Sequence, residues 1–180
     1  MEKNNINVEY LADFSVDASL DAQIRGLLTT CFTKPEDVVF KDRRYFLEPY
    51  PHRWVIWDAD GSIIAHVGVH EKTVEAEGYT FRVGGIAEVC VHPEFRGRGY
   101  VKTLLACVHD WLMRHKFDFA ILFGVPRVYG SSGYVQVNNL VHDDVTAAGE
   151  SCVSQNPAMV RQLSDTPWPA KQVYLPGPKF

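Results

Sequence analysis

The sequence lacks the long apolar segments of a membrane protein. In 180 residues no apolar run approaches the ~20 residues that a membrane-spanning helix needs. The first residues, Met1 to Asn5, are polar and have no apolar stretch of the kind found in a secretory leader. We therefore expect a cytoplasmic protein without a membrane partner.

Clusters of positive charge are also missing. The chain has 18 Lys and Arg against 22 Asp and Glu, a formal net charge of -4, and no run of cations. Because nucleic-acid phosphates are bound by clustered cations, we expect no nucleic-acid partner.

The 46% hydrophobic content is that of an ordinary globular protein. The length fits a single domain over residues 1–180 that buries its own core.

The cysteines and histidines show no metal-binding or redox motif. The four cysteines are Cys31, Cys90, Cys107 and Cys152. They contain no CxxC pair and no framework spacing, so we expect reduced thiols. His66 and His70 have the spacing of zinc ligands on a helix, but their segment has the pattern of a strand and no Glu between them completes HExxH. We expect no metal and interpret both as partly buried structural histidines; the alternative is that they share one strand face and border the acceptor site.

Hydrophobic periodicity predicts an α/β (α+β) domain with a mostly antiparallel sheet of six to seven strands and flanking helices. A first strand is expected within 6–14, followed by a helix over 17–30 capped by Asp17 or Ser19. The next strands are expected at 53–57, 62–75 and 79–92, with turns between them. A helix from 97 to about 114 and a buried strand at 119–123 complete one βαβ crossover. A short helix at 126–132, a strand at 134–138, a helix within 157–163 and a strand at 171–175 follow.

The most informative segment is the glycine-containing loop Arg96-Gly97-Arg98-Gly99 between a strand and an amphipathic helix. Free N–H groups at a helix start form an anion site, and glycine lets a phosphate approach the backbone closely. Lys102 adds positive charge, but it also breaks the GxGxxG dinucleotide pattern, and Val101 breaks the P-loop pattern. The loop favours diphosphate binding. A glycine-rich helix start that binds nothing is an equally good interpretation of the loop alone.

Two motifs together carry a family resemblance. The segment Val91-His92-Pro93-Glu94-Phe95 followed by Arg96-Gly97-Arg98-Gly99-Tyr100-Val101 resembles motif A of the GNAT superfamily of acyl-CoA-dependent N-acyltransferases. Tyr129-Gly130-Ser131-Ser132-Gly133-Tyr134 resembles its motif B. The resemblance covers about residues 50 to 138, with Val101 standing where the family usually has Gly or Ala. It implies the GNAT fold and acetyl-CoA as cosubstrate.

The resemblance also implies roles for particular residues. Main-chain groups of Val89 and Val91 would pair with pantetheine, and a backbone N–H there would stabilise an oxyanion. Tyr129 would protonate the departing CoA thiolate; the alternative is a tyrosine packed on its helix with the hydroxyl in water. Glu88 is the first candidate for the base, the alternative being a carboxylate on a solvent-facing strand. The cofactor-binding residues implied are Val89, Cys90, Val91, Arg96, Gly97, Arg98, Gly99, Tyr100, Val101 and Lys102.

The acceptor is expected to be a primary amine of a small molecule. The segments 63–69 and 173–176 resemble aminoglycoside 2′-N-acetyltransferases, and a polycationic acceptor would need carboxylates around its site. The carboxylates considered, which are otherwise solvated helix faces, are Asp13, Asp17, Glu36, Asp37 and Glu48. Transfer of a longer acyl chain and a non-catalytic acyl-CoA sensor are the alternatives. Because dimers are common in this superfamily, a homodimer is among the expected states.

Overall fold

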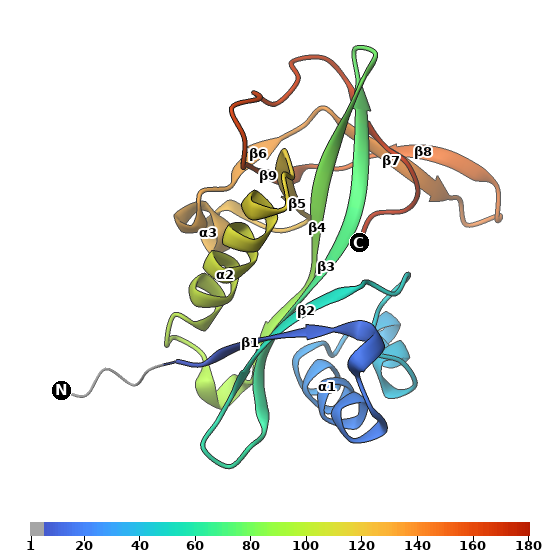
Figure 1. Ribbon diagram of the computed structural model, residues 1–180. Coiled ribbons are helices and arrows are strands. Elements are labelled where there is room, and N and C mark those ends of the chain that lie inside the picture. Colours follow the sequence, from blue (N-terminus) through green and yellow to red (C-terminus); the bar gives the residue numbers. More distant parts are fainter. Residues whose placement is uncertain (1–5) are drawn as a thin grey trace. The chain divides into compact units, whose positions relative to one another are not determined.

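The computed structural model describes residues 6–180, and the chain divides into two compact units. The first comprises Met1–His70 and Ala87–Val108, and the second comprises Glu71–Ile86 and His109–Phe180. Three elements, labelled in Figure 1, contain residues of both units. They are β3 (Ile63–Ala76), β4 (Tyr79–Val91) and α2 (Tyr100–Arg114).

The first unit contains an antiparallel group of strands and one long helix. Strand β1 (Val8–Ala12) pairs with β2 (His52–Trp57), and β2 pairs with β3. Helix α1 (Ala18–Cys31) begins where the sequence predicts, because the Asp17 carboxylate accepts a 2.8 Å hydrogen bond from the N–H of Leu20. Three 3-10 segments complete the unit: η1 (Asp13–Ser15), η2 (Pro35–Lys41) and η3 (Pro93–Phe95).

The core of the first unit forms under α1. Ile24, Leu27 and Leu28 recur at helical spacing, so they share one face of α1, and they pack with Val55 of β2 and Ile63 of β3. Each such buried side chain contributes roughly 1.5–3 kcal/mol relative to an exposed one. This packing fixes α1 against β2 and β3, and the same cluster includes Cys90 of β4, the strand that leads to the glycine-containing loop.

The second unit is a larger mixed group of strands, in the order β6-β9-β5-β4-β3-β10-β7-β8. Strand β4 pairs in parallel with β5 through Val83, Gly84 and Gly85, and β10 pairs in parallel with β7. The remaining pairs with a known register are antiparallel. The predicted βαβ crossover is thereby confirmed. The other strands are β5 (Phe119–Leu122), β6 (Val135–Val137), β7 (Leu140–Val145), β8 (Ser151–Gln155), β9 (Ala158–Gln162) and β10 (Val173–Leu175).

The core of the second unit is built from aliphatic and aromatic side chains. Phe119 and Ile121 of β5 are fully buried and pack with Val83 and Val160. The ring of Trp168 meets the ring of Phe119 edge-on, with the centroids 5.0 Å apart. The continuous apolar run of β5 is therefore explained by burial on both of its faces.

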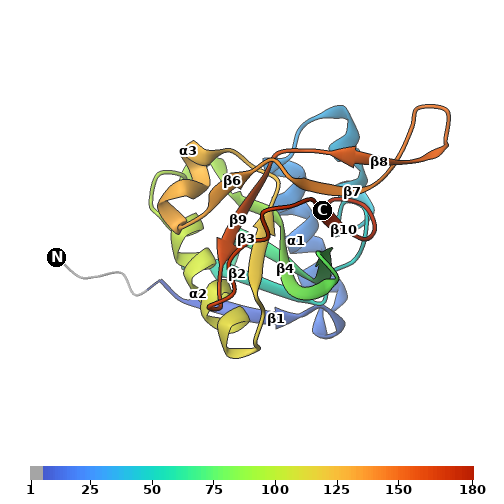
Figure 2. The same cartoon turned by 90° about the horizontal axis from the view of Figure 1, so that it is seen from above.

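The expected fold class is confirmed, but two details of the expectation are wrong. Residues 6–180 contain ten strands rather than six or seven. Segment 157–163, expected as a helix, is β9, because pairing with β5 and with β6 satisfies its backbone on both sides. The polar segment after residue 139 supplies β7 and β8, which pair as an antiparallel hairpin (Figure 2). Alternate residues of β8 are exposed.

Candidate active site

The glycine-containing loop adopts a conformation that only glycine reaches easily. Gly97 has φ of 76° and Gly99 has φ of 79°, both in the left-handed region. A Cβ atom added to either residue would meet nothing within 4 Å, so backbone geometry and not packing requires glycine here. Helix α2 starts at Tyr100, directly after Gly99, whose carbonyl accepts a 3.1 Å hydrogen bond from the N–H of Thr103.

Positive charge surrounds this loop, and internal hydrogen bonds hold it. Arg96 Nε donates to the carbonyl of Val91 at 3.2 Å, and Arg98 Nη2 donates to the carbonyl of Glu94 at 3.4 Å. The Arg98 guanidinium also lies over the ring of Phe95 at 4.9 Å. Arg96, Arg98 and Lys102 are exposed.

Three backbone N–H donors lie in the first turn of α2. The N–H groups of Tyr100, Val101 and Lys102 precede the first i to i-4 carbonyl of the helix, so they are available to an anion. Val101, where GNAT sequences usually have Gly or Ala, is half-buried in this first turn. The start of α2 therefore combines free amides, a positive helix dipole and cationic side chains.

Glu88 lies in a distorted part of β4. Its φ of 41° is left-handed, and both Glu88 and Val89 are half-buried, so the alternation of the strand is interrupted there. The Glu88 carboxylate accepts a 3.2 Å hydrogen bond from the N–H of Phe46, and its second oxygen is buried with no donor in the described part of the chain. Burial raises the pKa of Glu88, although the Tyr50 hydroxyl, the Phe46 N–H and Arg53 act in the opposite direction. The alternative of a solvent-facing carboxylate is wrong.

His66 holds the backbone of Glu88 in this conformation. Its Nδ1 lies 2.9 Å from the Glu88 carbonyl oxygen, and its Nε2 lies 3.1 Å from Arg53 Nη1. Because arginine can only donate, Nε2 accepts and Nδ1 carries the proton that it donates to Glu88. Burial, and then the charge of Arg53, lower the pKa of His66 to about 3, so the ring is neutral.

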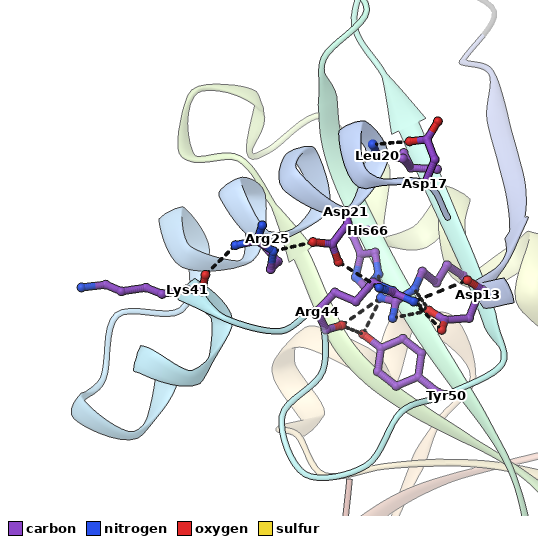
Figure 3. Close-up of polar contacts among 10 residues, drawn as sticks. Asp13, Asp17, Leu20, Asp21, Arg25, Lys41, Arg44, Tyr50 and His66 are labelled. Atoms are coloured by element: carbon purple, nitrogen blue, oxygen red, sulfur yellow. Dashed lines mark hydrogen bonds and ion pairs between the residues drawn. The ribbon is translucent and has the colours of Figure 1, made fainter. Parts of the chain in front are cut away.

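His66 belongs to a network of charged and polar side chains joined by hydrogen bonds and ion pairs (Figure 3). The Arg53 side chain is fully buried, and its Nη2 lies 2.7 Å from Oδ1 of Asp13. Arg53 Nη1 also donates to the Tyr50 hydroxyl at 2.9 Å, and the guanidinium lies 4.2 Å from the centre of the Tyr50 ring. Arg44 adds ion pairs of 2.8 Å to Asp13 and 2.9 Å to Asp21. Burial alone would raise the pKa of Asp13, but hydrogen bonds from Arg44 and Arg53 lower it.

Most of the carboxylates considered for a polycationic acceptor have other partners. Asp13 is paired with Arg44 and Arg53, and Asp17 caps α1. The Asp37 carboxylate accepts a 2.9 Å hydrogen bond from the N–H of Lys34. These three are therefore structural groups of the first unit.

The second unit contains Tyr129, at the end of the short helix α3 (Pro126–Tyr129). Its ring is half-buried and packs directly on Gly124, where an added Cβ would lie 2.4 Å from Tyr129 Cε2. The ring also meets that of Tyr134, with centroids 6.2 Å apart at 69°. Gly133 then turns the chain with φ of 83° after the 3-10 segment η4 (Gly130–Ser132).

Behind Tyr129 lies a buried polar pair. The Tyr134 hydroxyl and His109 Nε2 are 2.8 Å apart, and both residues are buried. Burial, and then the charge of Arg161, lower the pKa of His109 to about 4, while burial raises the pKa of Tyr134. Arg161 in turn donates to the carbonyl of Ser132 at 2.5 Å. Gly124 and Arg161 have no signal in the sequence, because only their contacts in the fold distinguish them.

Residues 6–180 show no membrane-spanning helix and no metal-binding cluster. No helix in this range is long and apolar enough to cross a membrane. The same residues hold no group of three or more His, Cys, Asp or Glu side chains placed to bind a metal ion. His66 and His70 are buried; His70 meets the Tyr50 ring edge-on at 5.1 Å. Both histidines are more deeply buried than expected.

The chain belongs to the GNAT acetyltransferase family. The family model described as "Acetyltransferase (GNAT) domain" matches residues 16–137, more than half of the chain. This confirms the superfamily indicated by the two motifs. The finer similarity to aminoglycoside 2′-N-acetyltransferases is not established, and no curated protein matches the chain significantly.

Solved structures show the same fold at low sequence identity. The GNAT-family N-acetyltransferase YhbS from Escherichia coli, solved with CoA, has a TM-score of 0.67 and 18% identity over 95% of this chain and 89% of that one. A GNAT acetyltransferase from Brucella melitensis, solved with acetyl-CoA, has a TM-score of 0.59 and 15% identity over 93% of this chain and 94% of that one. An acyl-CoA N-acyltransferase from Pseudomonas aeruginosa has a TM-score of 0.59 and 18% identity over 87% of this chain and 99% of that one.

Proposed function

We propose that this protein is an N-acetyltransferase that moves an acetyl group from acetyl-CoA to a primary amine of a small molecule. The observation that carries the proposal is the start of α2. Two left-handed glycines, Gly97 and Gly99, lead into free helix amides beside exposed Arg96, Arg98 and Lys102, in a chain of the GNAT family. These groups match the charge and size of a pyrophosphate.

The same proposal gives β4 its role in binding the cofactor. The distortion at Glu88 interrupts the regular strand just before Val89, Cys90 and Val91. The register that pairs β4 with β5 ends at Gly85, so pairing with β5 does not occupy the backbone groups of these three residues. The Val91 carbonyl already accepts hydrogen bonds from Cys31 Sγ and Arg96 Nε. We expect main-chain groups of Val89 and the N–H of Val91 to bind the pantetheine amides of acetyl-CoA, with both units belonging to one catalytic domain.

Two side chains are assigned to proton transfer. Glu88 is the proposed base: its raised pKa makes it a stronger proton acceptor than an ordinary carboxylate, and its second oxygen has no donor among the described residues. Because that oxygen is buried, we expect the proton of the ammonium to reach it through a water molecule. Tyr129 is the proposed acid, since a phenol is protonated at neutral pH and its ring is fixed on Gly124.

Fewer acidic side chains are available to bind a polycationic acceptor than the sequence suggested. Asp13, Asp17 and Asp37 make contacts within the protein. A polycation would therefore have to be bound by other carboxylates. Aminoglycosides remain one arm of the test, beside polyamines, amino acids and peptide amines.

The central experiment measures thiol release from acetyl-CoA over this panel of amines. An amine-free blank subtracts the four cysteines of the protein. Isothermal titration calorimetry measures acetyl-CoA affinity separately. Release that depends on one class of amine supports the proposal and identifies the acceptor. If a long-chain acyl-CoA is turned over faster than acetyl-CoA, the reaction is transfer of a longer acyl chain. Binding of acetyl-CoA without any thiol release would favour the non-catalytic acyl-CoA sensor. Absence of both binding and release would overturn the proposal.

Matched variants separate cofactor binding from chemistry. Arg98→Gln should raise the Kd of acetyl-CoA about 10-fold, because it removes a cation that we assign to the pyrophosphate. Arg114→Gln, on an exposed residue of the same helix, is the control and should leave Kd unchanged. Tyr129→Phe and Glu88→Gln should each lower kcat by about 10²-fold or more, with little change in that Kd. A loss of acetyl-CoA affinity in Tyr129→Phe would contradict its role as the acid.

A further inference from the structure

Two cysteines lie together at the end of β4. Cys31 is the last residue of α1, and its Sγ donates to the carbonyl of Val91 at 3.4 Å. Cys90 is the residue before Val91, and Cys31 packs against the core cluster to which Cys90 belongs. The Cys31 sulfur therefore lies beside the backbone of Val91, one residue from Cys90 and against the same cluster. Both cysteines are reduced in this structure.

The surroundings make the two thiols chemically unequal. The neighbouring Cys90 thiol and the charge of Arg96 lower the pKa of Cys31, against the effect of burial. The neighbouring Cys31 and burial raise the pKa of Cys90. Cys31 is therefore the more easily ionised and the more nucleophilic of the two thiols. Cys31 is half-buried and Cys90 is 5% exposed, so an oxidant reaches Cys31 first.

We propose that Cys31 and Cys90 form a peroxide-reactive pair that closes a reversible disulfide between α1 and β4. The Cys31 thiolate attacks one oxygen of hydrogen peroxide, the O–O bond breaks, and Cys31 becomes a sulfenic acid while hydroxide leaves as water after protonation. The Cys90 sulfur then attacks the Cys31 sulfur, the S–O bond breaks, and a second water leaves. Overall, two thiols lose two electrons and two protons to one peroxide.

The site of this disulfide gives it a consequence. The Val91 carbonyl accepts hydrogen bonds from both Cys31 Sγ and Arg96 Nε. Disulfide formation removes the Cys31 donor at this carbonyl, directly before the glycine-containing loop. This inference concerns the thiols themselves and does not depend on the proposed acetyl transfer.

The experiment exposes the intact folded protein to a small excess of hydrogen peroxide at pH 7.5. Remaining thiols are then blocked with iodoacetamide in denaturant, and the chain is digested for mass spectrometry. Cys107 on α2 and Cys152 on β8 are the references within the chain. We expect a peptide pair linked through Cys31 and Cys90 that dithiothreitol separates, formed at least ~10-fold faster than oxidation of either reference cysteine.

Two variants identify which sulfur reacts first. In Cys90→Ser, the Cys31 sulfenic acid has no partner, so dimedone should label Cys31 and no linked peptide should form. In Cys31→Ser, Cys90 should remain a thiol. Absence of the Cys31–Cys90 link in the wild-type protein would overturn the proposal, as would oxidation of Cys107 or Cys152 at the rate of Cys31. The wild-type measurement decides even if a variant folds poorly.

Discussion

The two units fill their interiors in different ways. In the first, Arg53 is fully buried and joins Asp13, Tyr50 and His66 in a charged network. In the second, Phe119 and its neighbours form an apolar core, and the buried polar pair His109–Tyr134 is uncharged. The packing of an apolar core does not depend on pH. Buried ion pairs, in contrast, hold their chain segments in place only while each partner keeps its charge. The charged network lies behind the backbone of Glu88, where geometry matters most for the proposed chemistry.

The largest effects should come from removing one central side chain from each interior. Arg53→Met should lower the free energy of unfolding by about 3 kcal/mol, because Asp13 and His66 lose a buried partner while Arg44 still holds Asp13. Urea unfolding at pH 7 measures this. Arg114→Met, which breaks the exposed pair with Asp110, is the control and should cost under about 0.5 kcal/mol. Equal losses in both variants would contradict the importance of burial.

Phe119→Ala should cost about 3–5 kcal/mol by leaving a cavity in the second unit. The pH dependence then separates the two interiors. The loss in Arg53→Met should shrink only as the pH falls below the ordinary pKa of a carboxyl group and through the lowered pKa of Asp13, because protonation there removes the charge of Asp13. The loss in Phe119→Ala should stay constant with pH. A pH-independent loss in Arg53→Met would mean that its packing, and not its charge, stabilises the first unit.

The next effect concerns the buried histidines. The pKa of His66 falls from 6.5 in the unfolded chain to about 3 in the fold. A lowered pKa means that the unfolded chain binds more protons below pH 6.5, so stability is complete above that pH and decreases as the pH falls. By pH 5 the loss from His66 should reach about 2 kcal/mol. His109, with a pKa of about 4, should contribute a similar loss in the second unit.

Urea unfolding between pH 5 and 8 tests this for the wild-type protein, His66→Asn and His109→Gln. Each variant should lose about half of the pH dependence of the wild type over this range. His115→Gln, on an exposed residue at the end of α2, is the matched control and should keep the full dependence. An unchanged slope in His66→Asn would show that other groups cause it.

A smaller effect is expected at the left-handed glycines. Gly97→Ala should cost about 1–2 kcal/mol through backbone strain alone, since its Cβ meets nothing. Gly133→Ala in the second unit should cost more, because its Cβ would also lie 2.3 Å from Arg161 Nη1. Gly26→Ala, exposed within α1 and without neighbours, should instead stabilise by about 0.5–1 kcal/mol. Thermal unfolding of the three variants checks the order and the sign.

The smallest effect concerns the cap of α1. Asp17→Ala should cost about 1 kcal/mol because the N–H of Leu20 loses its acceptor. Asp17→Asn keeps an acceptor oxygen and should cost less. Circular dichroism during urea unfolding measures both variants. A loss as large in Asp17→Asn as in Asp17→Ala would mean that the charge beside the helix dipole matters more than the hydrogen bond.

Local patterns explain what sequence analysis predicted correctly. The cap at Asp17, the helix from Tyr100 and the buried strand at Phe119 depend on residues within one or two turns of each other. Segment 157–163 was predicted incorrectly because its strand state depends on β5 and β6 and not on its own residues. The roles of Glu88 and Tyr129 remain proposals that the variants above test.

The sequence by itself determined the family, the glycine-containing loop and the order of strand, helix and strand around it, because each is encoded by neighbouring residues. Only the tertiary structure decided that Arg53 is buried, that His66 is neutral and holds Glu88, and that Cys31 meets Cys90. The physical reason is distance along the chain. Asp13 meets Arg53 across 40 residues, and Cys31 meets Val91 across 60, so no local pattern contains the charge or the burial that results.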